Sequence, residues 1–347
     1  MNITFLSPGL NKNRGGERVI FGYAKALIKK GHSVSIVVPK GMVFLNDKKI
    51  NIIEYNSILS SFYSRQLGYI DAILPAIRKI PKNTDILIGT YVPQMIISTV
   101  YKIMNKGVKY IMFNQDFSDM FVKRPERMLM FKIYPKFADK IISISQFCAD
   151  EVYKHSGKKS IVIRNGIENE YFDIAEKKQN VTDYIFWIGS KNRHKGYKEF
   201  WEAMNIVWEK YPNIKLYTTE GALDVNDNVE VLKINGNLNL LKETYRNALL
   251  FVCSSHSEGF GLPGIEAMSQ GCPVVTTDTG GSREYAKDKY NSIVVPPKNS
   301  KNLAEAIISL LGNRSVRDKF SENGINTARD FNWDIAFEKF NQEIMNV

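Results

Sequence analysis

Two glutamates on either side of a glycine-rich stretch are the residues of this chain best suited to binding a polar ligand. Glu258 and Glu266 bracket residues 259–265, with the sequence GFGLPGI, which follow an apolar run and lead into a helical pattern. Glycines there let backbone N–H groups approach a ligand at a helix N-terminus, a position that favours phosphate or sugar hydroxyls. The carboxylate of Glu266, at the start of the helix, can accept hydrogen bonds from a vicinal diol.

The same stretch also fits a dinucleotide-binding pattern. Residues 259–264 match G-x-G-x-x-G, and Asp278 ends the next predicted strand at about the distance of a ribose-binding acid. Under this alternative the chain is a nicotinamide-dependent enzyme. A single match of this kind is weak, Pro263 intrudes into it, and it leaves Glu258 and Glu266 without a role.

A second loop carries cations that suit a diphosphate. Residues 189–196 read GSKNRHKG and lie between a predicted strand and a predicted helix. Lys195, just before that helix, can meet the negative charge that builds on a departing diphosphate. Lys191 and Arg193 lie in the same loop, and for these two an ordinary solvated role explains the sequence equally well.

Two loops in the first half of the chain also follow predicted strands. Gly15 and Gly16 precede a helical pattern, where a simple turn at the helix start is the alternative interpretation. Gln115 and Asp116 follow the run 110–114 and could orient a reactive hydroxyl. For Asp116, a loop-capping carboxylate is the alternative.

The elements that must position these loops form two α/β series. Short apolar runs rich in β-branched residues alternate with helical patterns, which predicts parallel sheets with helices on both faces. Ligands of such sheets lie beyond the carboxyl ends of the strands, where the four loops fall. The predicted strands are 3–6, 33–38, 86–90, 110–114, 141–144 and 161–163, and then 184–189, 214–218, 229–232, 249–254, 273–277 and 292–295.

An Asn-Gly turn at residues 165–166 interrupts this rhythm and predicts the domain boundary. We expect a Rossmann-like domain over residues 1–166 and a second one over residues 167–330. Residues 331–347 form one more amphipathic helix pattern, which we expect to pack back on the N-terminal domain. A length of 347 residues agrees with two domains of ordinary size.

Composition narrows the class of protein. The net charge of +11 allows a nucleic acid, an anionic membrane surface or a phosphate-bearing substrate, but no nucleic-acid-binding motif accompanies it. Three cysteines without metal-type spacing fit a reducing compartment. The N-terminus resembles a first strand and not a signal peptide. Apolar runs fall short of the roughly 20 residues of a membrane span. We therefore expect a cytoplasmic protein without a nucleic-acid partner.

Together these motifs resemble one known family. Glu258-Gly-Phe-Gly-Leu-Pro-x-x-Glu266-Ala-Met, the following Gly-x-Pro-Val-Val and the Gly-Gly turn before Glu284 look like the retaining glycosyltransferases of the GT-B fold, family 4, also called glycosyl transferases group 1. The resemblance implies two doubly wound Rossmann-like domains facing a central cleft. It implies transfer of a hexosyl or deoxyhexosyl group from a nucleoside-diphosphate sugar to a glycan, glycolipid or glycoprotein acceptor, as in polysaccharide synthesis.

Site residues follow from the resemblance position by position. Glu266 would bind the donor ribose, Glu258 would bind hydroxyls of the donor sugar, and the backbone at Phe260, Gly261 and Leu262 would meet the sugar and the diphosphate. Further donor-binding positions are Gly189, Arg193 and Lys195 in one domain and Gly15 and Gly16 in the other. Asp116 would position the acceptor. The chain has no Asp-x-Asp motif, so we expect no metal and no other cofactor.

The sequence departs from the family at two positions. Ser190 stands where an arginine is common, and Gln115 stands where many relatives carry a histidine. Both departures put the usual donor and acceptor in doubt. Cations and large apolar residues alternate over residues 123–136, which predicts peripheral contact with an anionic membrane face or, as the alternative, an ordinary helix packed on the sheet. A non-catalytic sugar-binding protein also stays open.

Overall fold

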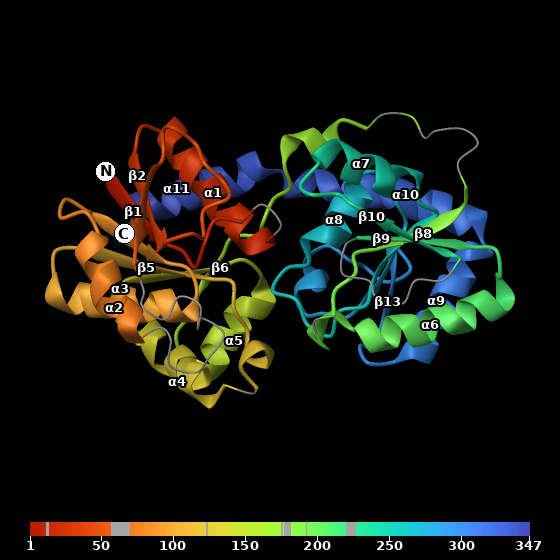
Figure 1. The fold of residues 1–347 in the computed structure, drawn as a ribbon, viewed down its shortest axis with the longest axis horizontal. Coiled ribbons are helices and arrows are strands. Elements are labelled where there is room, and N and C mark those ends of the chain that lie inside the picture. The colour runs from red at the N-terminus through yellow and green to blue at the C-terminus, as the bar shows by residue number, and fades with distance from the viewer. Residues whose placement is uncertain are drawn as a thin grey trace. The chain divides into compact units, whose positions relative to one another are not determined.

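The computed structural model describes residues 1–11, 14–56, 70–122, 124–174, 176, 182–191, 193–219 and 227–347. These residues form two compact units, one made of Met1–Arg164 with Ala336–Val347 and the other of Asn165–Ile335. The sequence predicts the boundary after residue 166 and a tail that begins at residue 331. Both chain ends lie in the first unit (Figure 1).

The first unit contains a seven-stranded parallel sheet in the order β3-β2-β1-β4-β5-β6-β7. Its central strands are apolar on both faces and buried, as strands covered by helices on both sides must be. The strands are β1 (Asn2–Leu6), β2 (Ser33–Pro39), β3 (Asn51–Tyr55), β4 (Ile86–Gly89), β5 (Lys109–Asn114), β6 (Lys140–Ser143) and β7 (Ile161–Val162).

Helices follow most of these strands. They are α1 (Gly15–Lys29), α2 (Ile70–Lys79), α3 (Val92–Met104), α4 (Pro125–Ile133) and α5 (Gln146–Ser156), with short 3-10 turns η2 (Ser118–Phe121) and η3 (Tyr134–Phe137). The last helix, α11 (Trp333–Met345), returns to this unit. Its Phe340 ring lies 4.1 Å from the ring of Tyr23 on α1, and Glu343 forms a 2.7 Å ion pair with Lys140. These contacts hold the end of the chain against the first unit.

The second unit contains a six-stranded parallel sheet in the order β10-β9-β8-β11-β12-β13. Its strands are β8 (Tyr184–Trp187), β9 (Lys215–Thr219), β10 (Val229–Leu232), β11 (Leu250–Cys253), β12 (Val274–Thr277) and β13 (Ser292–Val295). Its helices are α6 (Tyr197–Lys210), α7 (Leu238–Asn247), α8 (Leu262–Ser269), α9 (Ser300–Leu311) and α10 (Arg314–Ala328), with 3-10 turns η4 (Asn169–Phe172), η5 (Arg193–Lys195), η6 (Gly281–Glu284) and η7 (Arg329–Phe331).

Strand order shows where each sheet can bind a ligand. In the first sheet the order reverses between β1 and β4, and in the second it reverses between β8 and β11. In open parallel sheets the two loops that leave such a pair of strands diverge, and a crevice for ligands opens there. The loops after β1 and β4, and those after β8 and β11, are therefore the places to look for a site.

Candidate active site

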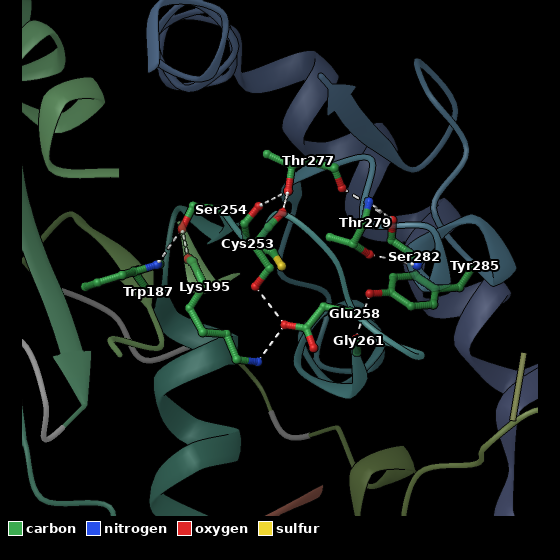
Figure 2. Close-up of polar contacts among 11 residues, drawn as sticks. Trp187, Lys195, Cys253, Ser254, Glu258, Gly261, Thr277, Thr279, Ser282 and Tyr285 are labelled. Atoms are coloured by element: carbon green, nitrogen blue, oxygen red, sulfur yellow. Dashed lines mark hydrogen bonds and ion pairs between the residues drawn. The ribbon is translucent and has the colours of Figure 1, made fainter. Parts of the chain in front are cut away.

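An ion pair joins the two loops at the reversal point of the second unit (Figure 2). Lys195, at the end of η5, places its Nζ 2.6 Å from Oε1 of Glu258 in the loop after β11. The hydroxyl of Ser255 donates to the same oxygen at 2.7 Å. Burial favours the neutral amine, but attraction to Glu258 outweighs it and raises the pKa of Lys195. Lys195 therefore stays charged, and its side chain remains 39% exposed.

The backbone at Lys195 is held by Ser254, the residue that directly follows strand β11. The Trp187 indole N–H donates to the Ser254 hydroxyl at 3.1 Å, and that hydroxyl donates to the carbonyl oxygen of Lys195 at 2.8 Å (Figure 2). Gly196 follows with φ at +63°, and a Cβ placed on it would overlap the carbonyl oxygen of Ser254. Gly196 is therefore required here for two reasons, its left-handed backbone and its close approach to Ser254.

The loop of Glu258 is fixed by the turn that follows β12. The N–H of Glu258 donates to the carbonyl of Thr279 at 3.0 Å, and the N–H of Gly281 donates to the carbonyl of Glu258 at 3.1 Å. Ser282 and Thr279 exchange hydrogen bonds between their hydroxyls and backbone N–H groups at 3.2 and 3.0 Å, which closes that turn. A Cβ on Gly281 would lie 2.6 Å from the carbonyl oxygen of Glu258. Backbone contacts thus fix Glu258 on both sides.

Gly261 begins helix α8 as its N-cap, with φ at +86°. The hydroxyl of Tyr285 donates to the Gly261 carbonyl at 2.6 Å, and a Cβ on Gly264 would overlap that hydroxyl. The Phe260 side chain is buried, with its ring 5.9 Å from that of Tyr285. Leu262 is the first residue of α8. Tyr285, which no sequence motif marks, therefore sets the position of this loop.

Glu266 lies within α8 with only 2% of its surface exposed. The Tyr245 hydroxyl donates to its carboxylate at 3.4 Å. Gly189 lies two residues after the end of β8 and is buried, in the loop that leads to η5. The side chain of Arg193 and all of Asn192 lie outside the described residues. The donor-binding roles of these residues stay predictions.

Asp278, the ribose-binding acid of the dinucleotide alternative, has another partner. Arg283 donates to its two carboxylate oxygens from Nε at 2.8 Å and from Nη2 at 2.7 Å. The hydrogen bonds from Arg283 lower the pKa of Asp278 and keep it ionised. This bidentate pair occupies the carboxylate that the dinucleotide interpretation needs for a ribose, and it argues against that interpretation.

The reversal point of the first unit brings together Gly16, Tyr91 and Gln115. Gly15 and Gly16 form the first turn of α1, and not a loop before it as the sequence suggested, because Arg14 is the N-cap. A Cβ on Gly16 would overlap the Tyr91 hydroxyl, and the Gln115 amide donates to the Gly16 carbonyl at 3.3 Å. No motif marks Tyr91 in the sequence; its position two residues after the end of β4 is the available signal.

Asp116 follows Gln115 in the loop after β5 and is only 2% exposed. Its carboxylate accepts the backbone N–H of Val92 at 3.0 Å, so it caps the first turn of α3 from the loop after β5. Burial raises the pKa of Asp116 to about 7, although the bond from Val92 and the charge of Arg127 act against that rise. The capping role anticipated as the alternative is therefore present, and acceptor positioning by Asp116 stays a prediction.

The raised pKa of Asp116 predicts a pH-dependent stability. Between the ordinary value of 3.8 and about 7 the folded protein holds a proton that the unfolded chain releases. The contribution of this proton to the stability of the fold is full below pH 3.8 and is lost as the pH rises through 7. Asp116→Asn keeps an acceptor for Val92 and cannot ionise. Urea unfolding measures the effect. The free energy of unfolding of the variant minus that of wild type should rise by about 1 to 3 kcal/mol from pH 5 to pH 8, because only the wild type loses stability.

Asp150→Asn removes an exposed carboxyl of α5 in the same unit and serves as the matched control. A relative stability of Asp116→Asn that is flat between pH 5 and 8, or that matches the Asp150→Asn variant, contradicts a raised pKa at Asp116.

Two family models match the chain. The model described as Glycosyltransferase Family 4 matches residues 13–171, and the model described as Glycosyl transferases group 1 matches residues 169–327. A capsular polysaccharide biosynthesis glycosyltransferase of Staphylococcus aureus, CapM, is 29% identical over 222 residues, which are 56% of this chain and 58% of that protein. The aligned regions cover 58%, 23% and 58% of three curated relatives, so the chain matches less than two thirds of the length of each.

Solved structures share the whole fold. Sucrose-phosphate synthase from Thermosynechococcus elongatus superposes with a TM-score of 0.85 at 16% identity, covering 100% of this chain and 98% of that one. Anabaena HepE in complex with UDP and glucose superposes with a TM-score of 0.80 at 14% identity, covering 100% of both chains. At these identities the likeness concerns the fold, and it confirms the predicted α/β class with two Rossmann-like parallel sheets.

Proposed function

The chain belongs to the glycosyltransferases of the GT-B fold, since both matching family models describe glycosyltransferases, and we propose that it transfers a sugar from a nucleoside-diphosphate sugar to a hydroxyl group. The observation that carries this proposal is the 2.6 Å ion pair between Lys195 and Glu258 at the reversal point of the second sheet. It places one cation and one carboxylate side by side, as a ligand with a diphosphate and sugar hydroxyls requires.

The donor is proposed to lie across the loops after β8 and β11. Lys195 would bind the diphosphate, and Glu258 would accept hydrogen bonds from hydroxyls of the sugar. N–H groups at the start of α8 would face the phosphates. Glu266, whose carboxylate accepts a hydrogen bond from the Tyr245 hydroxyl, would bind the ribose. The complex of HepE with UDP and glucose supports a nucleotide donor.

We propose transfer with retention of the anomeric configuration. The acceptor oxygen bonds to the anomeric carbon as the bond from that carbon to the diphosphate oxygen breaks, on the same face of the sugar. The departing nucleoside diphosphate takes the electron pair of the broken bond, and one of its phosphate oxygens takes the acceptor proton. Lys195 and the backbone dipoles would stabilise the growing charge, which is usually the largest catalytic contribution.

No metal is part of this proposal. The sequence lacks Asp-x-Asp, and within the described ranges no three His, Cys, Asp or Glu side chains gather as ligands for a metal ion. A cation is instead available from Lys195, whose pKa is raised by Glu258 against the effect of burial. Addition of EDTA should leave the transfer rate unchanged.

The acceptor is proposed to be a growing glycan or glycolipid, at the cytoplasmic face of a membrane. CapM, named for capsular polysaccharide biosynthesis, supports the glycan. On α4 and its flanks, Val122, Leu129 and Phe137 are exposed beside the exposed Lys132 and Lys136, a mixture that suits an anionic interface. In the described parts of the chain, no helix has the length and apolarity needed to cross a bilayer. Sedimentation with phosphatidylglycerol vesicles, compared with neutral vesicles, tests the contact.

The test of the function is turnover of a donor panel. UDP-, GDP- and ADP-sugars are incubated with the protein, and release of the nucleoside diphosphate is followed with and without added glycan or lipid extract. We expect release from one nucleotide class. Tight binding of a sugar nucleotide with no release from any donor would support the remaining alternative, a non-catalytic sugar-binding protein.

A further inference from the structure

In the structure, the proposed phosphate-binding cation and the proposed sugar-binding carboxylate bind each other. Nζ of Lys195 lies 2.6 Å from Oε1 of Glu258 (Figure 2), and the Ser255 hydroxyl lies 2.7 Å from that same oxygen. A diphosphate that takes Lys195 as its partner must therefore draw the ammonium group away from Glu258 or share it. Binding at this point is an exchange of partners.

The two partners are unequally free to move. Glu258 is anchored through its backbone N–H to Thr279 at 3.0 Å and through its carbonyl to Gly281 at 3.1 Å. Its side chain is 19% exposed, against 39% for Lys195. Lysine also has a long flexible stem. When a phosphate attracts Lys195, the ammonium group is the one that moves, and the carboxylate stays behind beside a new anion.

A carboxylate left in that position has lost its cation in a poorly hydrated place, which is unfavourable. A sugar nucleotide offers compensation, because the hydroxyls of its sugar can donate to Glu258. A nucleoside diphosphate, the product, offers a phosphate for Lys195 and nothing for Glu258. The same carboxylate therefore favours one ligand and opposes the other.

Resting on the proposed function, we infer that Glu258 competes with the product diphosphate for Lys195, and so discriminates the sugar nucleotide from the nucleoside diphosphate and promotes product release. Glu258 thus has a thermodynamic role besides its contact with the sugar. This role depends on the ion pair between Glu258 and Lys195 and on the fixed backbone of Glu258.

Calorimetry on the full chain tests this inference with Glu258→Gln, which keeps the shape of the side chain and removes its charge. The first ligand pair is UDP and UDP-glucose, replaced by the corresponding pair if the donor panel identifies another nucleotide. The Kd of UDP should fall about three- to tenfold, because Lys195 no longer has a competing anion. The Kd of UDP-glucose should rise about tenfold, because the sugar loses a charged acceptor.

Two further variants isolate the ion pair. Ser255→Ala removes the other hydrogen bond to Oε1 of Glu258 and keeps both charges, so UDP affinity should stay within about twofold of wild type. In a Lys195→Ala background, Glu258→Gln should no longer tighten UDP, because the cation that both anions seek is gone. The coupling across this double-mutant cycle measures the competition.

The outcomes separate the inference from the proposed function. If Glu258→Gln weakens UDP, the competition for Lys195 does not exist. If it tightens UDP and UDP-glucose alike, Glu258 does not discriminate between them, and the inference fails. In both cases the donor site stands. If tightening of UDP persists in the Lys195→Ala background, it does not act through Lys195, and the inference is wrong. If the wild-type protein binds no nucleoside diphosphate and turns over no sugar nucleotide, the proposed function itself fails.

Discussion

Lys195→Ala should lower the rate of nucleoside diphosphate release from the donor about 10²- to 10³-fold at saturating donor, the usual effect of removing one preorganised charge donor. The loss should appear mainly in kcat, because the charge on the departing diphosphate is greatest in the transition state. Initial rates over a range of donor concentrations give both kcat and KM.

The matched control for this variant is Lys198→Ala. Lys198 lies on the first turn of α6, 82% exposed, and pairs with Glu202 at 3.6 Å. Its removal should leave kcat unchanged. Both variants should unfold in urea within about 1 kcal/mol of wild type, since partly exposed ion pairs contribute little to stability. A Lys195→Ala enzyme with more than a tenth of wild-type kcat would contradict the assigned role.

Gly196→Ala should reduce kcat to a similar extent through the backbone alone. Gly196 has φ at +63°, and a Cβ there would overlap the carbonyl oxygen of Ser254, a backbone atom that no rotamer change can remove. The loop must shift, and it takes Lys195 away from Glu258. We also expect a loss of about 2 to 4 kcal/mol in the free energy of unfolding, from strain and from the broken contact with Ser254.

Gly157→Ala separates the backbone strain from the overlap. Gly157 also has positive φ, at +71°, and within the described part of the chain a Cβ placed on it meets no atom within 4 Å. This control should cost about 1 kcal/mol and leave activity intact. If Gly196→Ala and Gly157→Ala behave alike in rate and stability, the contact between Gly196 and Ser254 does not position Lys195.

Much of the fold could be predicted because parallel strands that are buried on both faces have continuous apolar sequences. Strands β1, β2, β4, β5 and β6 all follow such runs. Strand β3 (Asn51–Tyr55) was missed, since it lies at the edge of its sheet with exposed and half-buried residues mixed along it. An edge strand of this kind lacks the signal that identifies the others.

The candidate site could be predicted only in part. Lys195 and Glu258 were found from their sequence patterns, but their 2.6 Å contact depends on β8 and β11 lying side by side. The supports from Ser254, Thr279 and Tyr285 come from distant segments, and no local pattern reveals them. For Asp116 the sequence pattern is ambiguous. An aspartate that follows a strand looks the same in the sequence whether it caps a helix, as Asp116 does at Val92, or contacts a ligand.

The central claim is that the loops of Lys195 and Glu258 bind a nucleoside-diphosphate sugar, and titration calorimetry tests it most directly. Wild-type protein is titrated with UDP-, GDP- and ADP-sugars and with NAD, and the titrations are repeated on Lys195→Ala. We predict that one class of sugar nucleotide binds the wild type, that Lys195→Ala weakens it at least about tenfold, and that NAD does not bind. Binding of NAD without any sugar nucleotide, or sugar-nucleotide affinity indifferent to Lys195, would contradict the account.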